Sequence, residues 1–427
     1  MTISLRKICC TSGGIFAVWF CLLTAASAAP SASKPATKSE PVSELIQRGE
    51  FEKGIEQLQK SYLLFPLNPA FKKNLAEAYA AYGHQHFKQR NFELADENFV
   101  KAEELYPEEV NYLLLRGISN YHLKKYDVAR YELEKAKTLR EESAEVLYYL
   151  GLVQFDSDHR LEAIDLWEQA LKLSPGRSEI IELLKKSRKE NSVEAKMDRG
   201  HSSRFDLTYD PGVDTGFALA ILDVLESAAN LVGAELGLFP EARVPVGIYK
   251  RADYKTVTDS PDWSGGFYDG KIRLPFGALG EVTPPIRAVL YHEYAHVVVF
   301  EITRGNCPLW LNEGIAEIFG RMQHSRSLSE FGHAARSGKL VEFKNLEANF
   351  SGFSSSEAAL AYQQSYSLVT YMVATYGWHG IRQTLSGLGK GQSFDEAITA
   401  ALKDYNLNYN TLVSEWRGSI EREMVGR

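Results

Sequence analysis

Apolar and polar residues follow different patterns in the two halves of this 427-residue chain. In the carboxy-terminal half, the apolar stretch Thr215–Leu236 predicts a helix and residues 244–249 predict a strand. Residues after 280 have helical periodicity almost throughout, and the amino-terminal half predicts helices alone. We therefore expect an α+β chain, in which an all-α part precedes a domain with a small sheet and a mostly helical lobe.

Small residues recur every 34 residues in the amino-terminal half. Three series run in parallel: Gly83, Gly117 and Gly151; Ala95, Ala129 and Ala163; Ala102, Ala136 and Ala170. They resemble tetratricopeptide repeats, a superhelix in which small residues lie where the two helices of a repeat cross closely. A weaker repeat is offset by 41 residues, so seven extra residues, about two helical turns, lie between it and the next. We expect about four repeats over residues 41–177 and a capping helix through about Arg199.

The segment between Thr283 and Pro308 predicts a buried helix. Thr283 is followed by two prolines, which is typical of a capping hydroxyl and a first helical turn, and Gly305 with Pro308 marks the end. The residues between are apolar on almost every side, as in a helix of a protein core. The helix is short for a membrane span and carries Arg287, two histidines and two glutamates, so we do not interpret it as transmembrane.

Two histidines in this helix indicate a metal site. His292 and His296 lie one turn apart on the same face, so both imidazoles can reach one ion. Glu293, next to the first of them, is placed to take a proton from water bound to that ion and to pass it to a leaving group. Burying these three side chains without partners is costly, and a cation supplies partners for all three. The alternative is a pair of hydrogen-bonded core histidines.

The segment that follows supplies a third ligand. A second helix that turns back after residues 305–308 would place Glu313 opposite His292 and His296. Glu317 shares that face and is placed to accept the outer N–H of a ligating imidazole, which fixes its tautomer. A solvated acidic helix face is the alternative, although the apolar neighbours of both glutamates favour a core helix.

These motifs, H-E-Y-A-H at 292–296 and W-L-N-E-G-I-A-E at 310–317, resemble those of the gluzincin metallopeptidases, which include thermolysin and the aminopeptidase N-like enzymes. The resemblance implies that one Zn²⁺ per chain is bound by three ligands, His292, His296 and Glu313. It also implies that Glu293 is the general base and that Glu317 orients a histidine. It is strong over the helix pair and loose over residues 204–427. The spacer between the motifs is shorter than in those enzymes, and the chain has no Gly-x-Met-Glu-Asn element, so exopeptidase action is not supported.

Two further segments are candidates for contact with substrate. Residues 263–274 predict two short strands around an Asp-Gly turn, and in gluzincins an edge strand before the active helix pairs with the substrate backbone. An ordinary hairpin without such a role fits equally well. Residues 361–365, inside a predicted helix, resemble the corresponding region of peptidase-MA-like proteins. This implies that Tyr362 stabilises the oxyanion, with Tyr366 in reserve; the alternative is that both are core aromatics.

The amino terminus predicts export. Two basic residues precede an apolar run and an A-x-A type site at 26–28, which is typical of a signal peptide over residues 1–28, and residues 29–40 are composed like a flexible leader. Cleavage leaves Cys307 as the remaining cysteine, so no intrachain disulfide is expected. The net charge of −7 and the lack of a basic run argue against nucleic acid as a partner. We expect a periplasmic or secreted protein without a stable membrane span after signal cleavage.

Two functions fit these observations. The first is an exported zinc metallopeptidase, and specifically an endopeptidase, which hydrolyses peptide or protein substrates with Glu293 as general base. The repeat array with its capping helix, residues 41–199, would then recruit substrate or a protein partner on its concave face, or only support the catalytic domain at 204–427. The second is an interaction scaffold with a catalytically inactive or structural zinc domain. The intact Glu293 favours the first.

Overall fold

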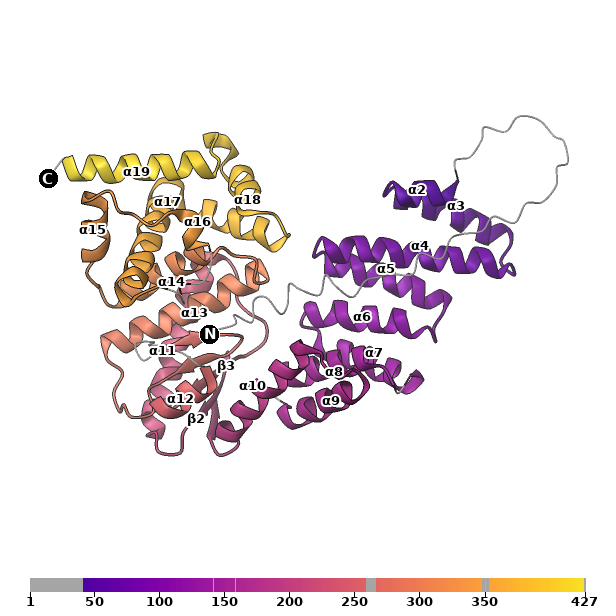
Figure 1. Ribbon diagram of the computed structural model, residues 1–427, viewed down its shortest axis with the longest axis horizontal. Helices are drawn as coiled ribbons and strands as arrows, with labels where there is room; N and C mark the ends of the chain where they lie inside the picture. Colours follow the sequence, from indigo (N-terminus) through magenta and orange to yellow (C-terminus); the bar gives the residue numbers. More distant parts are fainter. Residues whose placement is uncertain are drawn as a thin grey trace. The chain divides into compact units, whose positions relative to one another are not determined.

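The computed structural model describes residues 41–140, 142–157, 159–258, 266–347, 350 and 353–425. The signal peptide and leader expected over residues 1–40 lie outside the described residues. The described chain forms two compact units, one that ends at Arg188 and one that begins at Lys189. Figure 1 shows that the first consists of helices, whereas the second combines helices with a sheet.

Antiparallel helices follow one another through the first unit, which we call the repeat unit. They are α2 (Val42–Gln47), α3 (Phe51–Leu64), α4 (Pro69–Lys88), α5 (Phe92–Leu105), α6 (Val110–His122), α7 (Tyr126–Leu139), α8 (Ala144–Asp156), α9 (Arg160–Leu173) and the first turns of α10 (Ser178–Glu194). The second helix of each pair, α3, α5, α7 and α9, has 14 residues. This regular succession confirms the predicted repeats (Figure 1).

The small residues with the 34-residue period lie where the helices of one repeat cross. A Cβ atom added at Gly83, Gly117 or Gly151 would lie within 2.6 Å of a side chain on the second helix of the same repeat. The side chains concerned are Phe99, Leu133 and Trp167. The alanines of the other two series are fully buried. Close packing of helix against helix therefore explains the period.

Two elements depart from the regular period. Helix α4 has 20 residues, against 13 in α6 and in α8, and this longer helix contains the seven extra residues seen in the sequence. Helix α10 ends at Glu194, whereas we expected a capping helix through about Arg199. The prediction is wrong at this end because Asp198–His201 pairs with the next segment as a strand.

A five-stranded mixed sheet lies in the second unit. Its strands are β1 (Asp198–His201), β2 (Phe205–Tyr209), β3 (Val244–Ile248), β4 (Phe267–Tyr268) and β5 (Ile272–Leu274), in the order β1-β2-β3-β5-β4. The three inner strands are parallel, and β1 and β4 are antiparallel edges. β3 confirms the strand predicted at 244–249, and β4 with β5 confirms the predicted hairpin. The hairpin turns at Gly270, whose φ of 104° suits glycine.

Helices make up the rest of the second unit. They are α11 (Thr215–Leu236), α12 (Arg251–Thr258), α13 (Pro284–Thr303), α14 (Leu309–Gln323), α15 (Ser329–Arg336), α16 (Phe343–Leu346), α17 (Ser355–Gly389), α18 (Phe394–Ala401), η2 (Lys403–Tyr405) and α19 (Tyr409–Val425). Helix α11 has the predicted bounds. Within the described part of the chain it is the one helix whose length and composition would suit a membrane span, but 56% of that apolar stretch is buried inside the protein. Burial of this kind is typical of a core helix.

The two faces of the sheet are packed in different ways. Side chains on one face, including Val246, Ile272 and Leu274, join α11, α13 and α14 in a single hydrophobic core. On β5 the alternating residue Arg273 therefore points to the opposite face, where it is 2% exposed. There its guanidinium lies 2.8 Å from Glu190 and 3.2 Å from Glu194, in the last turns of α10. A buried ionic network thus anchors the hairpin.

Candidate metal centre

Helix α13 carries the two histidines of the candidate site. It begins at Pro284, as the sequence predicts, but the side chain of Thr283 makes no capping hydrogen bond. An N-cap oxygen accepts from the second or third N–H of a helix, and Pro285 removes one of these donors. At the other end Arg304 and Gly305 adopt left-handed conformations, with φ of 51° and 77°. The chain then enters α14 at Leu309.

Two glycines allow α14 to lie very close to its neighbours. A Cβ at Gly320 would lie 3.0 Å from the carbonyl oxygen of Ala288 on α13, and one at Gly314 would lie 2.5 Å from that of Ser365 on α17. Larger residues would push these backbones apart. The close packing places Glu313, which precedes one of the two glycines, against the histidines of α13.

The side chains of His292, His296 and Glu313 converge on one point. Their candidate ligand atoms all lie within 4.8 Å of one another. The two Nε2 atoms are 3.2 Å apart, and each lies 3.4 Å from Oε2 of Glu313. The structure therefore brings together the three residues that the sequence predicts as ligands.

The chemistry of this group fits a divalent cation. Oε2 of Glu313 is buried and has no hydrogen-bond partner within the described chain, although a buried carboxylate oxygen needs one. Burial alone would raise the pKa of Glu313, but the charges of His296 and His292 hold it well below its usual range. Burial alone would lower the pKa of His296, but the carboxylates of Glu313 and Glu293 raise it to about 9. The carboxylates thus favour positive charge at this point, and two imidazoles with one carboxylate are a ligand set of catalytic zinc.

An acceptor oxygen lies beside the outer ring nitrogen of each imidazole. Nδ1 of His296 lies 3.0 Å from Oδ1 of Asn312. An amide oxygen only accepts, so Nδ1 donates, and in the neutral ring Nε2 has the lone pair that a metal needs. Nδ1 of His292 lies 3.5 Å from Oε1 of Glu317, whose other oxygen accepts a 2.7 Å hydrogen bond from Nε of Arg321. Glu317 is therefore beside the histidine, where it was expected.

Glu293 lies buried beside the metal-binding group. Burial raises its pKa above the ordinary value, against the opposing effect of His292 and His296. Its side chain lies against Gly266, directly before strand β4: a Cβ there would come 2.6 Å from Oε1 of Glu293. The candidate base thus lies directly against the residue that leads into the edge strand of the sheet.

Comparison with known proteins agrees with this division of the chain. Residues 230–422 match the family model of the Peptidase MA superfamily, and residues 81–144 match a tetratricopeptide repeat model. The second unit contains a Peptidase MA superfamily domain. No curated protein matches the chain.

Solved structures that match part of the chain include two TPR domains and MamA protein. The first TPR domain of human RPAP3 is 23% identical, with a TM-score of 0.27, and the match covers 27% of this chain and 92% of that one. The Arabidopsis OM64 TPR domain is 19% identical, with a TM-score of 0.27, and the match covers 28% of this chain and 98% of that one. MamA protein is 19% identical, with a TM-score of 0.30, and the match covers 35% of this chain and 79% of that one.

The two candidate tyrosines have different surroundings in the Peptidase MA domain. The charge of Glu313, then burial, then Glu293 raise its pKa well above the ordinary value. Tyr366 instead lies under Arg321, whose guanidinium carbon is 4.6 Å from the centre of the ring. The carboxylates of the candidate site thus affect Tyr362, whereas Tyr366 contacts Arg321, the partner of Glu317.

Two residues around the site were not identified from the sequence. Asn312 directly precedes Glu313, and its identity as the partner of His296 depends on a side-chain rotation that helical periodicity does not fix. Arg321 lies four residues after Glu317, and this spacing of opposite charges could have indicated the pair.

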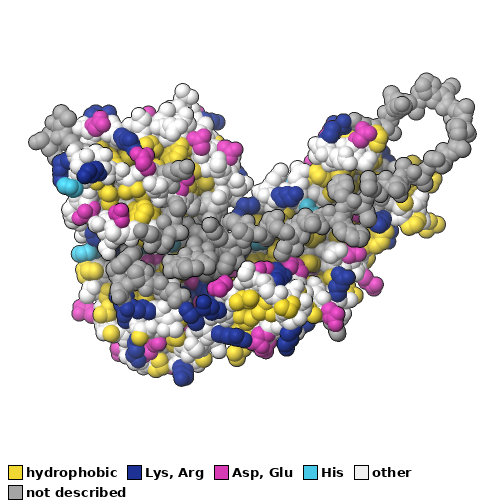
Figure 2. All heavy atoms as spheres, viewed as in Figure 1, with side chains coloured by type: hydrophobic (Ala, Val, Ile, Leu, Met, Phe, Trp, Pro, Cys, Tyr) yellow, Lys and Arg dark blue, Asp and Glu magenta, His cyan; other side chains and the backbone are white. Residues whose placement is uncertain are grey.

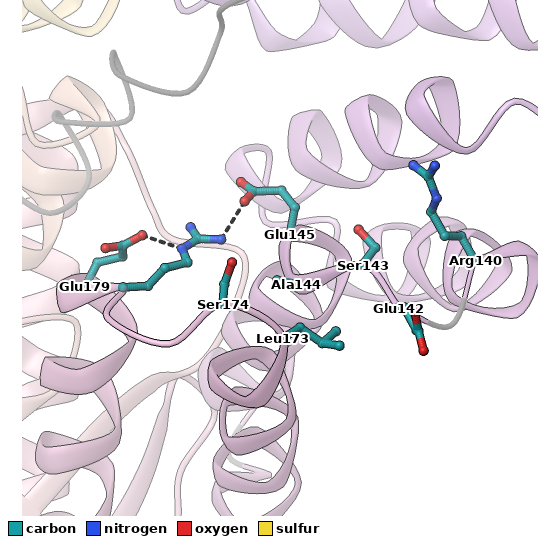
Figure 3. A pocket seen from close by; sticks show the side chains of 9 residues that line it. Arg140, Glu142, Ser143, Ala144, Glu145, Leu173, Ser174 and Glu179 are labelled. Carbon is teal, nitrogen blue, oxygen red and sulfur yellow. Dashed lines mark hydrogen bonds and ion pairs between the residues drawn. The ribbon is translucent and has the colours of Figure 1, made fainter.

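A polar cavity of about 520 Å³ lies in the repeat unit, apart from these residues. Its lining comes from residues 140–179, and Figure 3 shows Glu145 and Glu179 at one end. Arg177 forms ion pairs with both carboxylates, at 2.7 Å from Glu145 and at 2.6 Å from Glu179. The cavity contains none of the candidate site residues.

Proposed function

We propose that the Peptidase MA domain is a zinc-dependent endopeptidase. The proposal rests on the convergence of His292, His296 and Glu313, which direct two Nε2 atoms and a buried, otherwise unbonded Oε2 atom at one point. A set of two histidines and one glutamate is used by catalytic zinc sites that keep an open position. The family match over residues 230–422 supports peptidase chemistry in this unit.

The residues around the group have distinct roles in this proposal. Zinc, when bound, supplies the Lewis acidity that makes water a nucleophile near neutral pH. Glu293 accepts the proton of the attacking water and returns it to the leaving amine. Burial raises the pKa of Glu293, and this makes its carboxylate a stronger base than an exposed one. The pKa of Tyr362 is raised, so its phenol keeps its proton and can donate to the oxyanion.

Strand β4 is our candidate for holding the substrate. It is an edge strand that pairs with β5 on one side, and Gly266 before it lies against Glu293. An extended peptide that pairs along this edge would pass beside the base, and main-chain pairing makes few demands on sequence. We therefore propose peptide or protein substrates. We further propose that the protein is exported and that the repeats recruit a substrate or partner.

Metal analysis together with cleavage of a peptide library tests the proposal. We expect about one zinc per purified chain, internal cleavage by the wild type, and loss of turnover on Glu293→Gln with the zinc retained. The matched control is Glu301→Gln, a substitution of the second glutamate of α13, which lies more than two turns from the base. We expect this control to retain both zinc and activity.

The same experiment distinguishes the scaffold alternative. A scaffold with an inactive domain would bind zinc stoichiometrically and yet show no turnover in either the wild type or Glu293→Gln. A chain that purifies without zinc, and does not take it up on titration, would contradict both the peptidase and the structural-zinc hypotheses.

A further inference from the structure

An apolar tip stands at the connection between α3 and α4 of the repeat unit. Four large apolar side chains are exposed there, which are Leu63 (77%), Leu64 (74%), Phe65 (58%) and Leu67 (96%). Figure 2 shows hydrophobic side chains gathered over this end of the repeat unit, at the right of the view. A single exposed leucine is ordinary on a protein surface, but four within five residues form a patch that calls for an explanation.

At two of the four positions the later repeats carry polar or small residues, whereas Leu64 corresponds to a leucine in every repeat. With the offsets of 41 and then 34 residues, Leu63 corresponds to Glu104, Thr138 and Lys172. Leu67 corresponds to Glu108, Glu142 and Gly176. The fold therefore accepts polar or small residues at these positions, and packing within the repeats does not demand leucine.

The backbone of the tip is well defined and projects from the unit. N–H of Asn68 donates to the carbonyl of Phe65 at 3.0 Å, and the Asn68 side chain caps α4 by accepting from Ala70 at 3.0 Å. Helix α4 is seven residues longer than α6, which carries the tip about 10 Å beyond the next connection at 1.5 Å per residue. Figure 1 shows α4 reaching past α6. The tip is thus a convex, preformed apolar surface.

Lysines lie on both sides of the tip in the sequence. Residues 57–76 contain Lys60, Lys72 and Lys73 and no acidic residue, whereas the whole chain has a net charge of −7. Two of these lysines reach glutamates at the borders of the stretch, at 2.6 Å and 3.7 Å, in exposed ion pairs. Such pairs are weak in water and leave both lysines available to another anion.

We propose that this tip docks the protein on the surface of an anionic lipid bilayer. A convex apolar surface needs a pocket of matching shape on a protein partner, whereas lipid chains adapt to any shape. Leucine and phenylalanine side chains enter the boundary between headgroups and acyl chains, while lysines at the base attract anionic headgroups. Docking of this kind requires no membrane-spanning helix and is independent of the metal centre.

Vesicle binding tests this proposal on the processed protein isolated from cells. Mass spectrometry determines its amino terminus. Flotation is measured with phosphatidylcholine vesicles and with vesicles that also contain phosphatidylglycerol. We expect the wild type to bind the anionic vesicles at least tenfold more tightly. We expect the triple variant Leu63→Thr, Phe65→Ser and Leu67→Ser to lose that binding. The first two replacements are residues that the later repeats carry at the same positions.

Control variants separate docking from loss of structure. Leu161→Ser alters an exposed leucine of the repeat unit elsewhere, at 62% exposure, and should bind like the wild type. Lys72→Gln with Lys73→Gln should weaken binding severalfold, mainly at low salt. The tryptophan fluorescence emission of Phe65→Trp should shift to shorter wavelengths when anionic vesicles are added. Equal binding by the triple variant and the wild type would overturn the proposal, as would failure of the wild type to bind vesicles. If the tip crosslinks to a protein instead of binding vesicles, its partner is a protein and the lipid proposal is wrong.

Discussion

The hydrogen bond between His296 and Asn312 offers a sharp test of how the metal centre is held. In Asn312→Ala the Nδ1–H of His296 loses its acceptor at 3.0 Å, in a place where both residues are buried. A metal-bound ring cannot turn towards another acceptor, whereas the metal-free ring can. The substitution therefore weakens zinc binding more than it weakens the fold.

The size of the effect follows from two independent estimates. A buried donor left without a partner costs about 1–3 kcal/mol, which is roughly 5- to 150-fold in a binding constant at about 1.4 kcal/mol per factor of ten. Removal of an outer partner of a ligating histidine lowers metal affinity about 10–100-fold. We expect the Kd for zinc to rise by about 10–100-fold in Asn312→Ala and to change little in Asn312→Asp, which keeps an acceptor.

Competition with a chromophoric chelator measures this Kd directly. Asn98→Ala is the matched control, because it removes another buried asparagine side chain, from the repeat unit, where it donates to the carbonyl of Leu94. That variant should lose stability without any change in zinc affinity. If Asn312→Ala is folded and binds zinc as tightly as the wild type, the role assigned to Asn312 is wrong.

Three further predictions concern catalysis, pH dependence and stability. Tyr362→Phe should lower kcat by about 10²–10³-fold with little change in KM, whereas Tyr366→Phe should not, and steady-state kinetics on one cleaved peptide compares the two. Partial burial alone would raise the pKa of Glu226, but hydrogen bonds from Ser202, Ser203 and the N–H of Arg204, with the charge of Arg204, lower it. Because the folded-state pKa is the lower one, this carboxylate stabilises the fold above the unfolded pKa of about 4.3, and the stabilisation is lost as the pH falls through the folded pKa. Glu226→Gln should therefore lower the free energy of urea unfolding by about 1–2 kcal/mol at pH 7, by an amount that shrinks below pH 4; a pH-independent difference would contradict this. Arg273→Met removes a buried guanidinium that pairs with Glu190 and Glu194 and should cost about 3–5 kcal/mol, although Glu194 keeps its ion pair with Lys271. Arg243→Met, at an exposed pair with Asp206, should stay within about 0.5 kcal/mol of the wild type in the same assay.

Local periodicity accounts for the parts of the site that could be predicted. His292 and His296 share a face of α13 because they are four residues apart, and the short link to α14 brings Glu313 to the same place. The small-residue period likewise required helices that cross closely. Such features depend on backbone geometry that neighbouring residues determine.

Features that depend on distant residues could not be predicted in this way. Glu190 and Arg273 are 83 residues apart, and neither segment indicates that the other covers it. Strand β1 is mostly exposed and has no apolar alternation, so nothing in its sequence distinguishes it from the end of the preceding helix. Zinc binding, export and the catalytic role of Tyr362 remain predictions.

The contact between Gly266 and Glu293 couples the evolution of these two positions. Because a methyl group at 266 would occupy the space of the Glu293 side chain, selection for the base also keeps position 266 without a side chain. A lineage that abandons catalysis frees both positions at once. Among homologous sequences, we therefore expect larger residues at 266 to accumulate where the residue at 293 is no longer acidic, and the two changes together would mark domains that have become scaffolds.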